Sequence, residues 1–191
     1  NRINAVLSGS LNFIFNNFSD SYNFHDVVKE AGVQGFTEPD PREDLNGNDV
    51  GRKLLILARE LDLQNEFEEI QIQNLIPEAL REGSATDFLN RLSELDGIYQ
   101  NIKDAQGPNE VLRYIGELSG DLQQDKGKLE VKLISVPANS ALGSLKGSDS
   151  IFEIYTESYG EQPIVIQGAG AGPAVTARGV FGDILRFSEK K

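Results

Sequence analysis

The 191-residue sequence contains no cysteine, no methionine and only one histidine, His25. Without cysteine the chain cannot form a disulfide, a thiolate nucleophile or a zinc–thiolate site. A single histidine excludes a histidine-rich metal centre and argues against a Ser-His-Asp triad. A lone histidine at the start of a helix is usually structural, so we assign His25 no catalytic role, and we expect no metal ligands within this chain.

Basic residues are also scarce, with 18 Lys and Arg against 30 Asp and Glu and a net charge of −12. This balance argues against nucleic acid and anionic membranes as partners, because both attract basic surfaces. No apolar run approaches the ~20 residues of a membrane span, and the first residues lack the pattern of a secretory signal. We therefore expect a cytoplasmic protein that binds neither nucleic acid nor membrane. Because the chain begins at Asn1 and has no methionine, we also expect that a natural N-terminal part precedes it.

The hydrophobic pattern has a helical period first and a strand period later. Residues 3–18 fit either a buried helix or a strand followed by a helix. Helices are predicted at 24–32 (ending at Gly32), 49–61, 85–105 and 174–187, with a helical turn at 78–82. Strands are predicted at 70–76, 110–118, 128–136, 150–157 and 163–167. This order predicts an α+β fold with helices on one face of a mixed or antiparallel sheet, followed by a C-terminal strand-turn-helix.

The segment GFTEPDPREDLNGNDVGRK (35–53) is the densest in chemically active side chains. Pro39 and Pro41 stiffen the backbone of this acidic stretch, which is useful if its carboxylates must keep a fixed geometry. The alternative is a solvated acidic loop that leads into a helix, since acids favour the first helical turn.

A calcium loop is a third interpretation of the same segment. Asp44, Asn46 and Asn48 have the spacing of the first three ligands of an EF-hand. Asp49 stands where that loop needs glycine and Leu55 where it needs glutamate, so we reject calcium.

Lys53 follows Asp49 by four residues on the helix predicted at 49–61. The pair could be an exposed ion pair worth a few tenths of a kcal/mol, about 0.3. At ~100° per residue, however, Lys53 lies roughly 60° from Val50 and roughly 40° from Leu57 on the apolar stripe. Its side chain therefore leaves from the edge of the buried face, where an ammonium can serve as a proton donor.

Glycines are concentrated in GAGAGP (168–173), between a predicted strand and the closing helix. A strand, a glycine turn and a helix N-terminus can together cradle an anion. The glycine spacing is not that of a complete dinucleotide fingerprint, and the acidic residue expected about 20 residues on has no place before Lys191. Tight packing between strand and helix is the alternative reason for these glycines.

Four segments together resemble the homoserine dehydrogenase family: 7–15 (LSGSLNFIF), 35–53, 151–167 (IFEIYTESYGEQPIVIQ) and 167–183 (QGAGAGPAVTARGVFGD). Their order and spacing agree over nearly the whole chain, and these segments are most similar to the dehydrogenase part of bifunctional aspartokinase–homoserine dehydrogenases. The resemblance implies reversible reduction of aspartate 4-semialdehyde to homoserine with NADP or NAD. Asn48 and Gly51 depart from the family pattern, in which these positions are usually an apolar residue and a small residue with a Cβ.

The resemblance also implies roles for individual residues. Gly35, Glu38 and Asp49 match substrate-binding positions, and Asp44 matches a neighbouring active-site acid. Lys53 matches the lysine that transfers a proton to the substrate oxygen. Gly172 matches a position near the nicotinamide cofactor.

On this basis we expect residues 1–162 to form a substrate-binding and dimerisation domain that works as a homodimer. Residues 163–191 would pack with a nucleotide-binding domain that precedes Asn1. The segment that carries the family's structural cation would also lie upstream of Asn1. Lacking that domain, the chain by itself is expected to be inactive. A non-catalytic amino-acid-binding or regulatory module is the alternative, and it would need the carboxylates but not Lys53.

Overall fold

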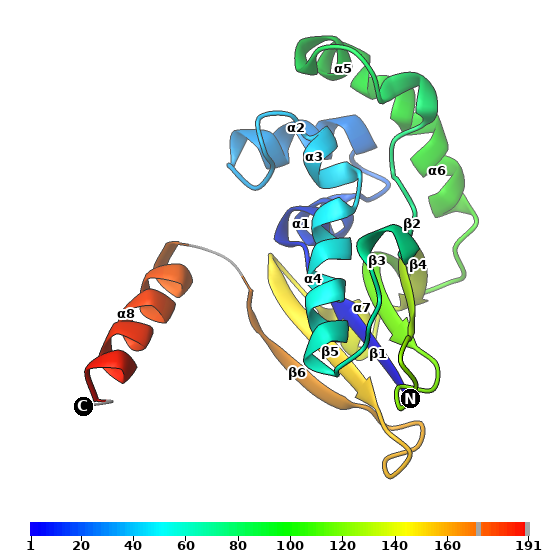
Figure 1. The fold of residues 1–191 in the computed structure, drawn as a ribbon. Coiled ribbons are helices and arrows are strands. Elements are labelled where there is room, and N and C mark those ends of the chain that lie inside the picture. Colours follow the sequence, from blue (N-terminus) through cyan, green and yellow to red (C-terminus); the bar gives the residue numbers. More distant parts are fainter. Residues whose placement is uncertain (171–172, 190–191) are drawn as a thin grey trace.

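The computed structural model describes residues 1–170 and 173–189 (Figure 1). The strands are β1 (Arg2–Val6), β2 (Gln71–Ile72), β3 (Glu110–Ser119), β4 (Lys128–Pro137), β5 (Asp149–Tyr155) and β6 (Ile164–Ala169). The α-helices are α1 (Gly9–Asn17), α2 (Phe24–Val33), α3 (Arg42–Leu45), α4 (Asn48–Glu60), α5 (Ala85–Arg91), α6 (Asp96–Asp104), α7 (Ala141–Ser144) and α8 (Pro173–Glu189). Three 3-10 turns are η1 (Phe67–Glu69), η2 (Glu78–Leu80) and η3 (Leu92–Leu95).

The described strands form one six-stranded sheet in the order β2-β4-β3-β1-β5-β6. β1 lies inside the sheet and pairs antiparallel with both β3 and β5, through Ala5 opposite Gly116 and Phe152. β2 runs parallel to β4, and the other pairs are antiparallel. The expected α+β class with a mixed sheet is confirmed, and β6 continues this sheet beyond β5.

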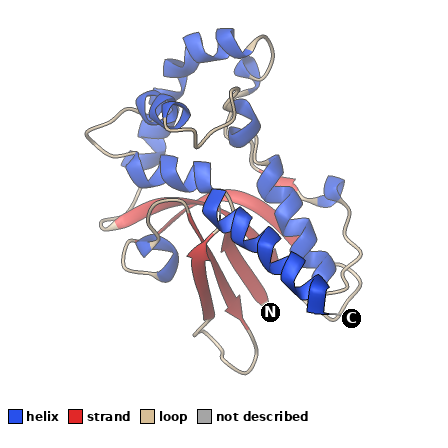
Figure 2. Ribbon diagram, turned by 90° about the vertical axis from the view of Figure 1, so that its left-hand side faces the viewer, coloured by secondary structure: helices blue, strands red, loops and turns tan. Residues whose placement is uncertain are grey.

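Most helices gather on one side of the sheet (Figure 2). Leu54 of α4 packs where Gly116 of β3 has no side chain, so that a Cβ there would lie 3.2 Å from a Leu54 methyl. The short helix α7 covers part of the opposite face, where Leu142 and Leu145 join Ile115 and Ile151 in a second apolar cluster. The sheet is therefore a layer with one face under helices and the other face only partly covered.

The helical part beyond the sheet is centred on aromatic rings. Phe24 of α2 stacks on Tyr99 of α6 with ring centroids 3.6 Å apart, and both side chains are fully buried. The Tyr99 hydroxyl donates to the carbonyl of Leu75 at 2.7 Å. His25 binds Asp96 through its backbone N–H at 2.9 Å and through Nδ1 at 2.6 Å, which ties α2 to α6. This contact gives His25 the structural role expected from the sequence.

Most of the elements expected from the sequence are present, with differences at several places. Residues 3–18 are a strand and then a helix, the second of the two alternatives. The left-handed residue after α2 is Gly35 (φ 74°) and not Gly32, which lies within the helix. The single helix predicted at 85–105 was wrong: it divides into α5, η3 and α6, because Asp96 is held by His25 at the point where α6 begins. The strand predicted at 70–76 was too long, because only Gln71–Ile72 pair with β4. The helices α3 and α7 and the turn η1 were not predicted.

Candidate active site

The loop that carries the candidate carboxylates folds around α3 and the start of α4. The Asp44 carboxylate accepts a hydrogen bond from the backbone N–H of Glu38 at 2.9 Å, which closes the loop on itself. Asn46 accepts from the backbone N–H of Asn48 at 2.8 Å and leads the chain into α4. Between α3 and α4, Gly47 has a φ of 78°, and a Cβ there would lie 2.0 Å from the Tyr114 hydroxyl, so only glycine fits.

Lys53 and Asp49 form the expected i, i+4 ion pair, with 2.8 Å between Nζ and Oδ2. Both side chains are about half exposed, at 47% and 55%, which places them at the edge of the buried face of α4. The Lys53 ammonium also donates to the carbonyl of Leu7 at 2.9 Å. Leu7 follows β1 directly, so the pair lies where α4 crosses the end of this strand.

Asp44 is a partly buried acid of this loop. Partial burial raises the pKa of its carboxyl, and the nearby negative charges of Glu38 and Asp49 raise it further. Hydrogen bonds from the Ser10 hydroxyl and from the Glu38 N–H oppose this rise in the pKa. These mutual effects place Glu38, Asp44 and Asp49 in one electrostatic neighbourhood beside Lys53.

The serines of the LSGS segment belong to the same neighbourhood and were not singled out from the sequence. The Ser8 hydroxyl accepts from the Leu11 N–H at 3.2 Å and caps α1. It also lies 2.9 Å from the Ser10 hydroxyl, which lowers the pKa of the Asp44 carboxyl. A serine before a helix start is a recognisable capping signal, but its link to Asp44 depends on the tertiary fold.

Gly35 lies at the entrance to this loop, after the C-terminal end of α2. Its positive φ lets the chain turn away from the helix, and the next residue, Phe36, stacks on Phe13 of α1 with ring centroids 4.4 Å apart. Glu38 follows on an exposed stretch of backbone. The segment from Gly35 to Glu38 is thus attached to α1 at one end and to Asp44 at the other.

The described residues contain no group of three or more acidic or histidine side chains arranged to hold a metal ion. The oxygens of Asp44 and Asn46, which share EF-hand spacing, instead accept backbone N–H groups. Gly51, which departs from the family pattern, lies where a Cβ would come within 2.7 Å of the Ile72 side chain. This close approach of β2 to α4 accounts for a glycine near the start of the helix.

The predicted strand-turn-helix at the C-terminus is present as β6 and α8. Gly172, the expected cofactor position, lies outside the described residues. Many apolar side chains of these elements are exposed, including Ile166 at 56%, Phe181 at 62% and Phe187 at 82%. Figure 1 shows α8 standing apart from the sheet and from the other helices.

The site residues lie on an open surface. Glu38, Asp49 and Lys53 are exposed. A broad hollow of about 1090 Å³ is lined by Arg2, Glu117 and Tyr155 at the beginning of β1, whereas Lys53 binds Leu7 beyond the other end of this strand. This hollow is therefore not lined by the candidate site residues.

No helix in the described ranges combines the length and the apolar character that crossing a membrane requires.

Comparison with known proteins matches residues 1–185 to the family model for homoserine dehydrogenase. The chain is 44% identical over 189 residues to a chloroplastic bifunctional aspartokinase/homoserine dehydrogenase 1 of Zea mays, which covers 98% of the chain and 20% of that protein. It is 42% identical over 201 residues to a homoserine dehydrogenase of Paracoccidioides brasiliensis, covering 99% of the chain and 53% of that protein.

A crystal structure of a Candida auris protein of unknown function has the same fold, with a TM-score of 0.84 and 39% identity. The match covers 99% of this chain and 53% of that one. The chain thus spans about half the length of the fungal proteins and a fifth of the plant protein.

Proposed function

Because this chain belongs to the homoserine dehydrogenase family, we propose that it is the substrate-binding part of an enzyme that interconverts aspartate 4-semialdehyde and homoserine with NADP or NAD. The observation that carries the proposal is the Lys53–Asp49 pair, anchored on Leu7 beside the carboxylates of Glu38 and Asp44. The family is one of oxidoreductases of amino-acid biosynthesis in the aspartate pathway. The substrate, the cofactor and the residue roles are the finer part of the proposal.

The substrate has a charged amino group and a carbonyl, and the site has a partner for each. The ammonium needs carboxylates held in fixed positions, and we assign this role to Glu38 and Asp49, with the Gly35 backbone beside them. Asp44 supports Glu38 by accepting its backbone N–H. A charge-assisted bond between the substrate ammonium and a carboxylate contributes about 1.5–3 kcal/mol.

We assign proton transfer to Lys53. Addition of hydride to the aldehyde carbon leaves negative charge on its oxygen, which must be stabilised and protonated. An ammonium has three N–H donors, and in the described part of the chain Asp49 and Leu7 take two of them. The third is available to the substrate oxygen, and the two fixed bonds hold Nζ in place for it.

The described residues fit one side of a nicotinamide site. Gly168 in β6 is exposed, and nothing lies within 4 Å of the position that a Cβ would occupy, so a flat ring could approach its backbone. Gly172 is the position that we assign to the cofactor, and the bound nicotinamide would supply the hydride. The exposed apolar faces of β6 and α8 would be covered by the nucleotide-binding domain, so residues 163–191 would link the two domains.

We further propose that the enzyme is a homodimer and that the sheet face opposite α4 is its interface. Beyond α7 this face carries charges of both signs, as in the contacts of Lys132 with Glu117 at 3.1 Å and with Glu130 at 3.0 Å. Asn4 and Glu153 on this face are buried, and the Asn4 Oδ1 has no hydrogen-bond partner among the described residues. A face that carries both positive and negative side chains can be complementary to the same face of a second copy related by a twofold axis.

The test is an assay of the full-length protein that contains this chain. We expect oxidation of NADPH or NADH with aspartate 4-semialdehyde and the reverse reaction with homoserine. Absence of both reactions in a folded protein would contradict the proposal. A fluorescent fusion of the same protein would test its place in the cytoplasm against the chloroplast, to which the Zea mays relative is assigned.

A further inference from the structure

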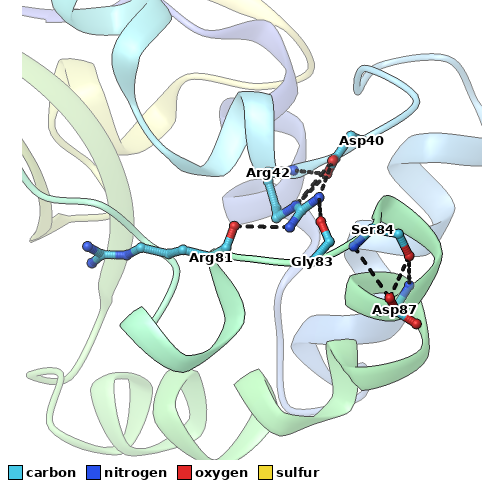
Figure 3. Close-up of polar contacts among 6 residues, drawn as sticks. All are labelled: Asp40, Arg42, Arg81, Gly83, Ser84 and Asp87. Atoms are coloured by element: carbon cyan, nitrogen blue, oxygen red, sulfur yellow. Dashed lines mark hydrogen bonds and ion pairs between the residues drawn. The ribbon is translucent and has the colours of Figure 1, made fainter.

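Arg42 has no role in the proposed site, yet its guanidinium donates hydrogen bonds to a carboxylate and to two backbone carbonyls (Figure 3). Its Nε donates to both carboxylate oxygens of Asp40 at 3.0 and 3.1 Å, and its Nη2 donates to Oδ2 at 2.6 Å. Nη1 donates to the carbonyl of Arg81 at 3.0 Å, and Nη2 donates to the carbonyl of Gly83 at 3.0 Å. The guanidinium thus joins one carboxylate of its own loop to two carbonyls that lie about 40 residues away in the sequence.

The pair is well shielded for a surface loop, with side-chain exposures of 14% for Arg42 and 26% for Asp40. Hydrogen bonds from Arg42 lower the pKa of Asp40, so the carboxylate keeps its charge and its hold on the guanidinium. The guanidinium carbon Cζ of Arg42 also lies over the ring of Phe88 in α5, 5.5 Å from the ring centroid. Arg42 is therefore seated against α5 and the turn before it.

The turn that receives Arg42 is itself held in place. Arg81 donates through Nε to the carbonyl of Ile76 at 2.8 Å. At the other end, Ser84 and Asp87 form a capping box at the start of α5, with the Ser84 hydroxyl 2.7 Å from the Asp87 carboxylate (Figure 3). The two carbonyls therefore present a fixed target.

On the other side of Arg42 lies the candidate site. Arg42 is the first residue of α3, and Asp44, two residues on, holds the backbone N–H of Glu38. Glu38 itself is exposed and follows Gly35 and the exposed Phe36. Arg42 therefore connects the turn at 81–84 to the loop that carries Glu38 and Asp44.

We propose that Arg42 is a positioning residue, which clamps the loop carrying Glu38 and Asp44 to the turn before α5 and thereby sets the affinity for the amino-acid substrate. The inference rests on the proposed function for its kinetic consequence only. Lysine cannot replace Arg42, because a single ammonium cannot span a carboxylate and two carbonyls in one plane.

The experiment compares Arg42→Lys with the wild type in the full-length protein. We expect KM for homoserine to rise about tenfold or more with kcat within about threefold, because the loop is displaced while Lys53 is untouched. Hydrogen exchange followed by mass spectrometry should show faster exchange in the peptide that covers residues 36–46. Asp40→Asn, which removes the charge of the partner, should shift both readouts in the same direction and serves if Arg42→Lys does not fold.

Arg91→Lys is the matched control. Arg91 also joins a carboxylate, Glu94, to a carbonyl, that of Ala79, but it does not contact the site loop. We expect KM and exchange at 36–46 to stay unchanged in this variant.

The inference is overturned if Arg42→Lys leaves KM within twofold of the wild type, if KM rises without faster exchange, or if Arg91→Lys has the same effects. If the wild type does not oxidise homoserine, the proposed function fails. The exchange comparison still decides whether Arg42 holds the loop.

Discussion

The ammonium of Lys53 lies 2.9 Å from the carbonyl oxygen of Leu7, and this hydrogen bond joins α4 to the end of the central strand β1. With the Asp49 carboxylate 2.8 Å away on the preceding turn, Nζ is held from two directions. An ion pair on an exposed helix gains little and leaves both side chains mobile. The added bond to the backbone of the strand gives Lys53 a defined position, which a proton donor needs.

Replacement of Lys53 separates a catalytic from a surface role. In the full-length protein we expect Lys53→Ala to lower kcat by roughly 10²–10⁴-fold, because the forming alkoxide loses its proton donor. Lys53→Arg should restore little, since arginine keeps the charge but does not release a proton near neutral pH. Arg59→Ala is the control, because Arg59 lies on the same helix as Lys53 and forms an exposed ion pair with Glu66, which lies outside that helix. If a folded Lys53→Ala enzyme has kcat within threefold of the wild type, Lys53 is not catalytic and only forms a surface ion pair.

Glu38 is expected to act on substrate capture. Glu38→Gln removes a charge that pairs with the substrate ammonium, a bond of about 1.5–3 kcal/mol, so KM for homoserine should rise roughly 10–100-fold. Asp49→Asn should raise KM as well and should also lower kcat, because Asp49 holds Lys53. The matched control is Glu43→Gln, an exposed glutamate of the same loop. Equal steady-state kinetics for Glu38→Gln, Asp49→Asn and Glu43→Gln would favour a solvated acidic loop.

Gly47 should be irreplaceable for stability. A Gly47→Ala side chain would meet the Tyr114 hydroxyl and would have to adopt a positive φ, so we expect a loss of more than about 1 kcal/mol in the free energy of unfolding. Gly97→Ala in α6 is the control, because no atom lies within 4 Å of its Cβ position and alanine favours helices. Urea unfolding of both variants measures the difference. A Gly47→Ala protein as stable as Gly97→Ala would contradict the geometry of the α3–α4 connection.

Asp44 and Asp40 should change the pH dependence of the free energy of unfolding in opposite directions. Burial raises the folded-state pKa of Asp44, so its folded form binds the proton more tightly than the unfolded chain. Its stabilising contribution is present at pH below the unfolded pKa, near 4, and is lost as pH rises through the raised folded pKa. Hydrogen bonds from Arg42 lower the folded-state pKa of Asp40, so its contribution is present above the unfolded pKa and is lost as pH falls through the lowered folded pKa.

The measurement is the free energy of unfolding between pH 3 and pH 7, about the range in which carboxyl groups titrate. Relative to Asp44→Asn, the wild type should lose stability as pH rises. Relative to Asp40→Asn, it should gain stability as pH rises. If the stability difference between wild type and variant changes with pH in the same direction for Asp44→Asn and Asp40→Asn, the pKa shift of at least one of the two carboxyl groups is wrongly assigned.

The 191-residue chain by itself is expected not to turn over substrate. The site lies open at Lys53, and the apolar faces of β6 and α8 are uncovered, so little holds a cofactor against the carbonyl. Steady-state assay of the purified chain with aspartate 4-semialdehyde and NADPH checks this expectation against the full-length protein. Turnover by the chain at a rate near that of the full-length protein would disprove it.

Local patterns in the amino-acid sequence determined a good part of this protein. The period of Val50, Leu54 and Ala58 determined the buried face of α4, and therefore that Asp49 and Lys53 share an edge of it. Alternation of Leu129, Val131 and Leu133 with polar residues indicated β4, and the change of hydrophobic period also predicted the long strand β3. The segment 35–53, together with 7–15, 151–167 and 167–183, indicated the family, which the family model confirms. Each of these features depends on residues a few positions apart, which sequence periodicity reports directly.

The tertiary structure decided the contacts between segments far apart in the chain. It placed β1 between β3 and β5, and so put the Leu7 carbonyl under Lys53. It brought Ser10 to Asp44, and it set the guanidinium of Arg42 on the carbonyls of Arg81 and Gly83. Backbone carbonyls are the same in every residue, so no side-chain pattern shows which one a distant lysine or arginine will reach. That choice follows only from the packing of helices on the sheet.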